Sequence, residues 1–228
     1  MILPKEIGRF ALKKQTSVLN IGRDYLQAVF LSVFYQQKAS QDFFFKGGTA
    51  LHFAYQSPRF SEDLDFSAHA FDCRVFENLL GASLVEMERV GLNPQLIESK
   101  PTTGGCLAIF SGLIGKLLVR MQIEVSLRTP KQTKGQVVLV RSEYLPPFNV
   151  LLLDEEALVK GKIAALLTRK KPRDFYDLYF LLRSSLKIAL SSEERKKIIK
   201  ELEKISPRYL FDELKEFLPK SHHLIIKN

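Results

Sequence analysis

The spacing of apolar residues divides the chain into two parts. Up to about residue 150, short apolar runs and the alternation of apolar with polar residues predict strands separated by helices. The predicted strands cover residues 43–46, 63–66, 106–111 and 117–127, and the predicted helices cover residues 16 or 17 to 38 and 76–90. This order of elements indicates a mixed sheet with flanking helices.

From about residue 151 the pattern is helical only. Asp154 is a suitable N-cap for a helix to about residue 170, and Pro172 ends that helix and can begin the next. Two further helices are predicted after Ser191, to about residue 205, and after Ser206, to about residue 218. We therefore expect an α+β fold, with residues 1–150 forming the sheet-containing core with N-terminal helices and residues 151–228 forming a helical C-terminal region. The basic, polar stretch 129–135 is predicted to be a mobile loop.

Two glycines follow the first predicted strand and open a helix. Gly47, Gly48 and Thr49 combine a backbone that can approach a ligand closely with the N–H groups of a helix N-terminus, and this combination suits the phosphates of a nucleotide. An ordinary strand-to-helix turn with a threonine cap is the alternative.

Carboxylates are predicted to gather on one face of the sheet. Asp63 and Asp65 alternate with two apolar residues, so a strand directs both carboxylates to the same side. Glu124 alternates in the same way with Ile123 and Val125 on a later strand. Carboxylates side by side repel one another unless a cation lies between them, and Mg²⁺ binds through carboxylates together with nucleotide oxygens. The three residues are therefore predicted to bind one or two Mg²⁺ ions, the alternative being charges that face water at strand ends.

The motifs together resemble a known family. GGTAL at residues 47–51 is followed by RxSxDxD at residues 59–65, then by the strand around Glu124, and then by a basic helix running into an RD motif at residues 173–174. Four pieces in this order, over residues 43–182, resemble the AbiEii/AbiGii toxin family of nucleotidyltransferases, which is MenT-like and belongs to the DNA polymerase β-like superfamily. The resemblance implies a polymerase β-like nucleotidyltransferase core whose active site is completed by the helical C-terminal region.

The resemblance also implies residue roles. Lys162 matches the lysine that contacts the triphosphate, and Asp174 matches the last acidic motif of the family, in which an aspartate acts as a base. Arg59, Ser61 and Arg169 are expected at the nucleotide, although Arg59 can equally be a structural bridge to a carboxylate and Arg169 can lie on a solvated helix face. The role of Asp177 stays open, and Asp174 can instead pair with Arg173 or cap its helix.

The charge of the chain indicates the class of its binding partner. The formal charge is +9, and residues 160–220 carry 16 Lys and Arg against 9 Asp and Glu, which favours an anionic partner such as RNA.

Cys73 and Cys106 have no metal-ligand spacing, and we expect both to be reduced. The N-terminus lacks a signal-peptide pattern and no apolar run is long enough to span a membrane, so a cytoplasmic protein is expected.

The function implied is transfer of a nucleoside monophosphate from an NTP to an acceptor hydroxyl with Mg²⁺. The resemblance implies the 3′ end of tRNA as acceptor, a role as toxin in a toxin–antitoxin or phage-defence system, and a cognate antitoxin as partner. Two alternatives remain open: transfer to a protein hydroxyl, and a non-catalytic module that binds nucleotide or RNA.

Overall fold

One seven-stranded mixed sheet forms the centre of the molecule. The computed structural model describes residues 4–69, 72–127 and 133–226. The strand order is β3-β4-β5-β2-β1-β7-β6. The strands are β1 (Phe43–Lys46), β2 (Leu64–Ala68), β3 (Gln95–Thr102), β4 (Gly105–Ile114), β5 (Leu117–Ser126), β6 (Gly135–Val140) and β7 (Phe148–Leu153). Most of the predicted loop at 129–135 lies outside the described residues, and Gly135 already belongs to β6.

The pairing of the three central strands brings the predicted site residues together. β2 runs antiparallel to β1 and parallel to β5. In this register Lys46 lies opposite Asp65, and Asp65 lies opposite Glu124. Side chains at paired positions project from the same face of a sheet. Three polar residues that are far apart in sequence therefore meet at one edge of the core.

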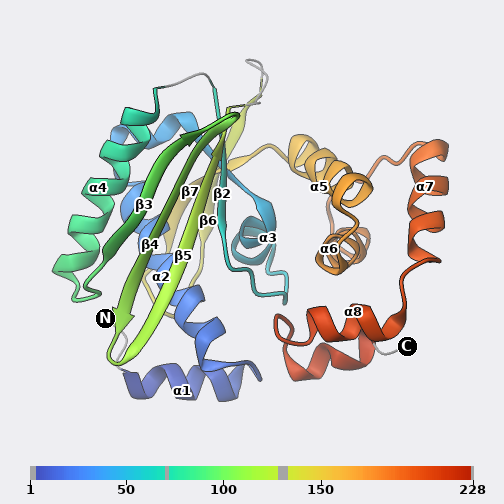
Figure 1. The fold of residues 1–228 in the computed structure, drawn as a ribbon, viewed down its shortest axis with the longest axis horizontal. Helices are drawn as coiled ribbons and strands as arrows, with labels where there is room; N and C mark the ends of the chain where they lie inside the picture. The colour runs from blue at the N-terminus through green and yellow to red at the C-terminus, as the bar shows by residue number, and fades with distance from the viewer. Residues whose placement is uncertain (1–3, 70–71, 128–132, 227–228) are drawn as a thin grey trace.

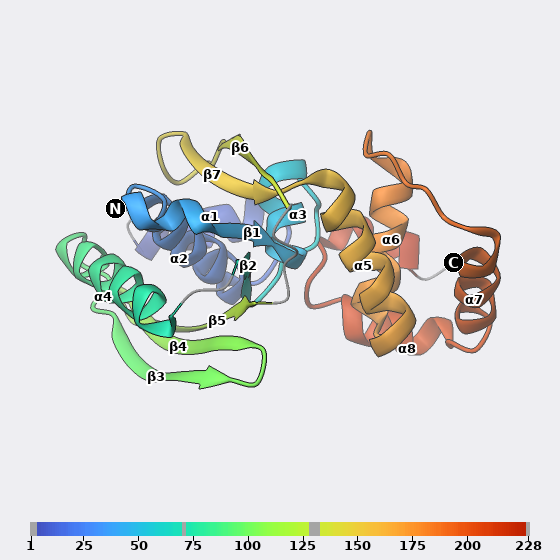
Figure 2. The same cartoon turned by 90° about the horizontal axis from the view of Figure 1, so that it is seen from above.

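Helices cover the apolar face of the sheet. The helices of this part are α1 (Pro4–Lys13), α2 (Val18–Phe34), the 3-10 helix η1 (Lys38–Asp42), α3 (Gly47–Tyr55) and α4 (Cys73–Arg89). The sheet curves around α2, with β3 and β4 on one side of the helix and β6 and β7 on the other (Figure 2). Phe34 of α2 packs its ring 5.2 Å from that of Phe66 and 5.8 Å from that of Phe43, so aromatic contacts join this helix to both central strands.

The last third is helical, as predicted. It contains α5 (Glu155–Arg169), α6 (Pro172–Arg183), α7 (Ser192–Leu202), α8 (Pro207–Leu214) and the 3-10 helix η2 (Lys220–Ile226). These helices form the side of the molecule beyond α3 (Figure 1). Hydrogen bonds join them to the core: the backbone N–H of Phe60 donates to the carbonyl of Phe217, and the amide of Asn20 donates to the carbonyl of Glu216.

The capping residues read from the sequence are confirmed. Ser17, Asp154, Ser191 and Ser206 each accept a hydrogen bond from a backbone N–H in the first turn of the helix that follows. Helix ends were less predictable. α2 stops at Phe34 rather than at residue 38, and α7 and α8 stop three and four residues before their predicted ends. Helix α1 and strands β3, β6 and β7 were not predicted.

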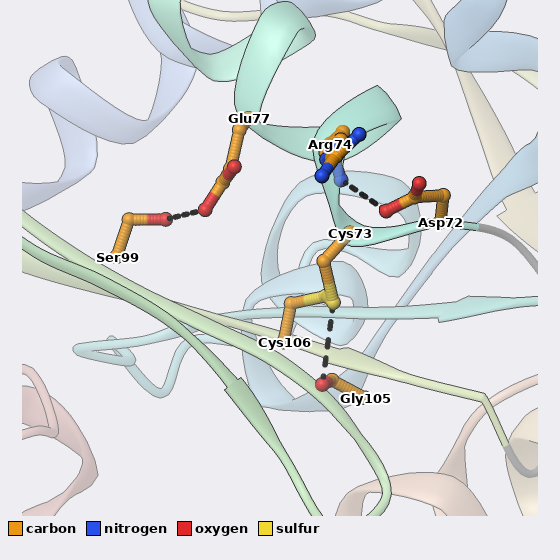
Figure 3. The surroundings of a disulfide bond; sticks show 7 residues. All are labelled: Asp72, Cys73, Arg74, Glu77, Ser99, Gly105 and Cys106. Carbon is orange, nitrogen blue, oxygen red and sulfur yellow. Dashed lines mark hydrogen bonds between the residues drawn. A yellow bond between two sulfur atoms is a disulfide. The ribbon is translucent and has the colours of Figure 1, made fainter.

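The two cysteines form a disulfide, so the expectation of reduced thiols is wrong. Cys73 begins α4 and Cys106 lies in β4, and the fold brings their Cα atoms to 6.1 Å (Figure 3). Their separation of 33 residues gave no sign of this proximity, because it depends on α4 packing across β4. Among the described helices, none is both long and apolar enough to cross a membrane.

Candidate active site

The predicted phosphate loop is packed tightly against two side chains of the protein itself. Gly47 has a φ of +86°, which favours glycine. A Cβ at Gly47 would lie 2.1 Å from Oδ2 of Asp65, and a Cβ at Gly48 would lie 2.3 Å from Nη2 of Arg59. The two glycines therefore let Asp65 and Arg59 lie directly against the start of α3.

Thr49 and Ser61 lie beside these glycines. Thr49 is fully buried, and its hydroxyl donates a hydrogen bond to the backbone carbonyl of Asp63. The hydroxyl oxygen of Ser61 would be 2.9 Å from a Cβ at Gly48, so this side chain borders the turn. Thr49 thus joins α3 to the residue that precedes β2, and its predicted contact with phosphate stays a prediction.

The carboxylates are neighbours, and their surroundings favour their protonated forms. Burial and the charges of Asp65, Glu62 and Glu124 together raise the pKa of Asp63 to about 6, although Arg173 opposes them. Burial and the charge of Glu124 also raise the pKa of Asp65, against Lys162, Lys46 and Arg169. This edge of the sheet therefore holds a concentration of negative charge that a cation would relieve.

The third carboxylate is more loosely placed. Glu124 is exposed, and its Oε1 accepts a hydrogen bond from Nε2 of Gln122 at 2.7 Å. Within the described ranges, no group of three or more His, Cys, Asp or Glu side chains is arranged to hold a metal ion. The three carboxylates are thus adjacent without forming a closed metal cage.

A buried ion network joins the carboxylate side of the site to the C-terminal helices. Arg59 donates to Asp177 through Nε at 2.8 Å and through Nη2 at 3.1 Å. Lys162 of α5 donates to Oδ2 of the same carboxylate at 2.6 Å. Burial would raise the pKa of Asp177, but the charges of Arg59 and Lys162 outweigh burial and lower it to about 2. Arg59 therefore forms the structural bridge that was one of its two predicted roles, and Asp177 is the carboxylate that it meets.

Asp174 occupies a second buried position at the start of α6. It accepts a hydrogen bond from Nη2 of Arg169 at 2.6 Å and another from the backbone N–H of Lys171 at 3.2 Å. Asp174 thus caps α6, which was one of the predicted alternatives to a catalytic base, and it pairs with Arg169 instead of the predicted Arg173. The predicted catalytic role of Asp174 stays a prediction.

A small cleft lies between the core and α5. Its volume is about 180 Å³, and its polar lining consists of Lys46, Gly47, Asp65, Lys162 and Arg169. Larger cavities of about 500 and 590 Å³ lie elsewhere in the described structure, and neither is lined by a predicted site residue. Of these three cavities, the small cleft is the relevant one because it is lined both by Asp65 and by basic residues of α5. Its size suits the phosphate end of a nucleotide rather than a whole nucleotide.

Lys46 is a site residue that the sequence reading missed. It ends β1, lies opposite Asp65 in the sheet and lowers the pKa of that carboxyl. Its position directly before the two glycines was the available signal, because a residue next to a helix N-terminus lies near the place where that terminus can bind an anion.

Comparisons with known proteins identify a family and similar folds. The family profile described as nucleotidyl transferase AbiEii toxin, Type IV TA system, matches residues 29–220. The structure is similar to that of MenT4, a nucleotidyltransferase toxin from Mycobacterium tuberculosis H37Rv, with a TM-score of 0.66 and 21% identity, over 82% of this chain and 66% of that one. JHP933 from Helicobacter pylori is similar with a TM-score of 0.59 and 22% identity, over 93% of this chain and 90% of that one.

At these identities the likeness to solved structures shows the fold. A search of curated proteins found no match. The family profile spans well over half of the chain and includes the glycine turn, the carboxylates and the basic helix. The chain therefore belongs to the AbiEii family of nucleotidyltransferase toxins of type IV toxin–antitoxin systems.

Proposed function

We propose that this protein transfers a nucleoside monophosphate from an NTP to the hydroxyl of an acceptor in a reaction that requires Mg²⁺. One observation carries the proposal: Asp65, a largely buried carboxylate with a raised pKa, lines the same cleft as Lys162 and Arg169. Such a cleft offers a place for a cation on one side and for phosphate charge on the other.

The residues present fit a magnesium ion. Asp63 and Asp65 would supply hard oxygen ligands, and their raised pKa values reflect burial together with repulsion by neighbouring carboxylates, which a divalent cation would relieve. Glu124, opposite Asp65 in the parallel pair, is placed to supply a third oxygen. When bound there, Mg²⁺ would neutralise charge that develops on the α-phosphate and its attacking and leaving oxygens.

The protein's own groups would bind and orient the triphosphate. The N-terminus of α3 at Gly47, Gly48 and Thr49 would offer backbone N–H groups and the positive end of the helix dipole to phosphate oxygens. Lys162 has its ammonium fixed at the cleft by Asp177, and Arg169 enters the cleft from the same helix. These two cations would neutralise the departing pyrophosphate.

The acceptor is proposed to be RNA, with the 3′ end of tRNA as the specific hydroxyl. The protein carries a net charge of +9, and 16 of its 34 Lys and Arg residues lie within residues 160–220. Several of these are paired with neighbouring carboxylates, for example Lys170 with Glu201 at 3.2 Å. Lys171 is exposed beside the site, at the start of α6, and is therefore the better candidate for an acceptor contact.

The experiment that tests this proposal separates its parts. The purified protein is incubated with each α-labelled NTP in turn, with Mg²⁺ or with EDTA, and with total RNA or total protein as acceptor. We expect label in small RNA only when Mg²⁺ is present, and no label with Asp65→Asn. Label in protein would show that the acceptor is protein and not RNA. Absence of label in every reaction would contradict the proposed transfer. Co-expression with the neighbouring gene tests for the cognate antitoxin expected of a toxin.

A further inference from the structure

The segment between α3 and β2, residues 56–63, has no helical or strand structure, although it carries Arg59, Ser61 and Asp63. We call it the carboxylate loop. Backbone carbonyls in such a segment have no ladder to satisfy them and need other donors. The structure supplies side chains for this purpose, and these side chains are not part of the cleft.

We infer that Gln27, His52 and Asp24 are positioning residues that hold the carboxylate loop in the geometry required for transfer. The inference rests on the proposed function. None of the three lines the cleft, and each is buried or nearly so.

Gln27 holds the end of the loop that leads to the metal ligands. It lies on α2 with only 1% of its surface exposed. Its Nε2 donates to the carbonyl of Ser61 at 2.9 Å and to that of Glu62 at 3.2 Å. Asp63 follows directly, and its own carbonyl accepts from Thr49. Three consecutive carbonyls are therefore fixed by side chains just before β2 begins.

His52 and Asp24 hold the other end. Nδ1 of His52 lies 2.6 Å from the carbonyl oxygen of Ser57, and Nε2 lies 3.1 Å from Oδ1 of Asp24. A carbonyl only accepts hydrogen bonds, so Nδ1 of His52 is the donor to Ser57, while Nε2 lies within ion-pair distance of the Asp24 carboxylate. Asp24 is one helical turn from Gln27 on α2, and so the same stretch of helix fastens both ends of the loop.

Asp24 is itself held firmly. Its Oδ2 accepts from the hydroxyl of Tyr144 at 2.7 Å and lies 3.4 Å from Nζ of Lys14. The side chain is 2% exposed, and a buried carboxylate with this many donors has a defined orientation. Asp24 thus holds a carboxylate at a fixed place on α2, with its Oδ1 3.1 Å from Nε2 of His52.

The consequence for the site is positional. Arg59 reaches Asp177 from the middle of this loop, and Asp63 leaves it at the carboxylate edge. A displacement of about 1 Å of a catalytic group can cost on the order of a hundredfold in rate. Loosening the loop should therefore lower kcat by about 10- to 100-fold while changing KM for NTP little, because the N-terminus of α3 and Lys162 remain in place.

The test replaces Gln27 and compares it with a matched control. Gln27→Met keeps the volume and removes the donor. Gln37→Met is the control, because Nε2 of Gln37 also makes two hydrogen bonds, to the carbonyl of Leu79 at 3.1 Å and to Oγ of Ser83 at 2.8 Å, but fastens α4 instead of the loop. kcat and KM for NTP are measured for both, together with amide hydrogen exchange of the protein without ligand.

In Gln27→Met we expect the kcat loss above and about tenfold faster exchange within residues 57–63, as the loss of one or two hydrogen bonds implies. In Gln37→Met we expect wild-type kcat and unchanged exchange in the loop. His52→Gln, which can donate to only one of the two acceptors, should reproduce the Gln27→Met result from the other end and covers the case of a Gln27→Met protein that does not fold.

The outcomes separate the positioning role of these side chains from the proposed transfer activity. Equal kcat and equal loop exchange in the two methionine variants would overturn the inference, and so would faster loop exchange without loss of kcat. Absence of transfer by the wild-type protein would instead contradict the proposed function, and hydrogen exchange would still show whether these side chains hold the loop.

Discussion

Replacing Asp177 by asparagine should destabilise the protein strongly, because among the described residues this carboxylate is the one within ion-pair distance of both Arg59 and Lys162. The side chains of Arg59, Asp177 and Lys162 are 4%, 2% and 10% exposed. Asparagine keeps the shape but removes the charge, which leaves Arg59 and Lys162 facing each other without compensation. Breaking a buried pair by removing one partner costs about 3–5 kcal/mol.

The pKa of Asp177 provides a second route to the magnitude. Burial alone would raise it, yet the two cations lower it from 3.8 to about 2. A difference of this size corresponds to about 2 kcal/mol favouring the charged form in the folded protein. The larger figure, about 3–5 kcal/mol, applies to Asp177→Asn, because this substitution also leaves two cations without their ion-pair partner. Urea unfolding at pH 7 should show that loss, with a fall in Tm of roughly 6–20 °C.

The pH dependence distinguishes this explanation from a loss of packing. Because the folded pKa of Asp177 lies below the unfolded value, its stabilisation is complete above about pH 4 and is lost as the pH falls toward 2. The difference between wild type and Asp177→Asn should therefore be constant from pH 7 to 5 and should shrink below 4. Asp212→Asn, which removes an exposed partner of Lys215, is the control and should leave stability unchanged. A loss below about 1 kcal/mol at pH 7, the range of a surface pair, would refute the argument.

Four further outcomes are expected. Asp65→Asn should abolish transfer without lowering Tm, because it removes a desolvated charge; retained transfer would exclude the residue from the metal site. Lys162→Ala should raise KM for NTP and lower kcat in steady-state assays, and unchanged NTP dependence would place the phosphates elsewhere. Lys171→Glu should weaken tRNA binding and reduce its salt dependence without altering NTP affinity, whereas equal salt slopes in titrations of the two proteins would place the acceptor on another surface. Reducing Cys73–Cys106 should lower the free energy of unfolding by about 2–4 kcal/mol, read from urea midpoints with and without a reducing agent; no change would show that the bond does not constrain the unfolded chain.

Sequence by itself determined the features that depend on near neighbours. Helix starts followed from capping residues such as Ser17 and Asp154, because a cap acts within its own first turn. The strand at Phe43–Lys46 and the glycine turn after it followed from an apolar run and from residue types with special backbone freedom. The ordered motifs also predicted the family, which the profile match over residues 29–220 confirmed.

The edge strands and the helix ends were harder, for a physical reason. β3 carries mostly exposed side chains along Gln95–Thr102, so it has no apolar alternation to detect and is held by its ladder with β4. α2 ends at Phe34 without a glycine or proline, because the following turn packs as the 3-10 helix η1. In both cases the segment is held by the element that follows it and not by an apolar or capping pattern of its own.

Only the tertiary structure decided which polar residues meet. The bidentate contact of Arg59 with Asp177 spans 118 residues, and the contact of Lys162 with the same carboxylate comes from a different helix. The sequence does not distinguish Gln27 from other polar residues of an amphipathic helix, because its contact with the carboxylate loop exists only in the folded protein. In the same way, Cys73 meets Cys106 only because α4 packs across β4. Residue types and their spacing encode local structure, whereas these contacts depend on packing that joins distant segments, so they could be read only from the folded chain.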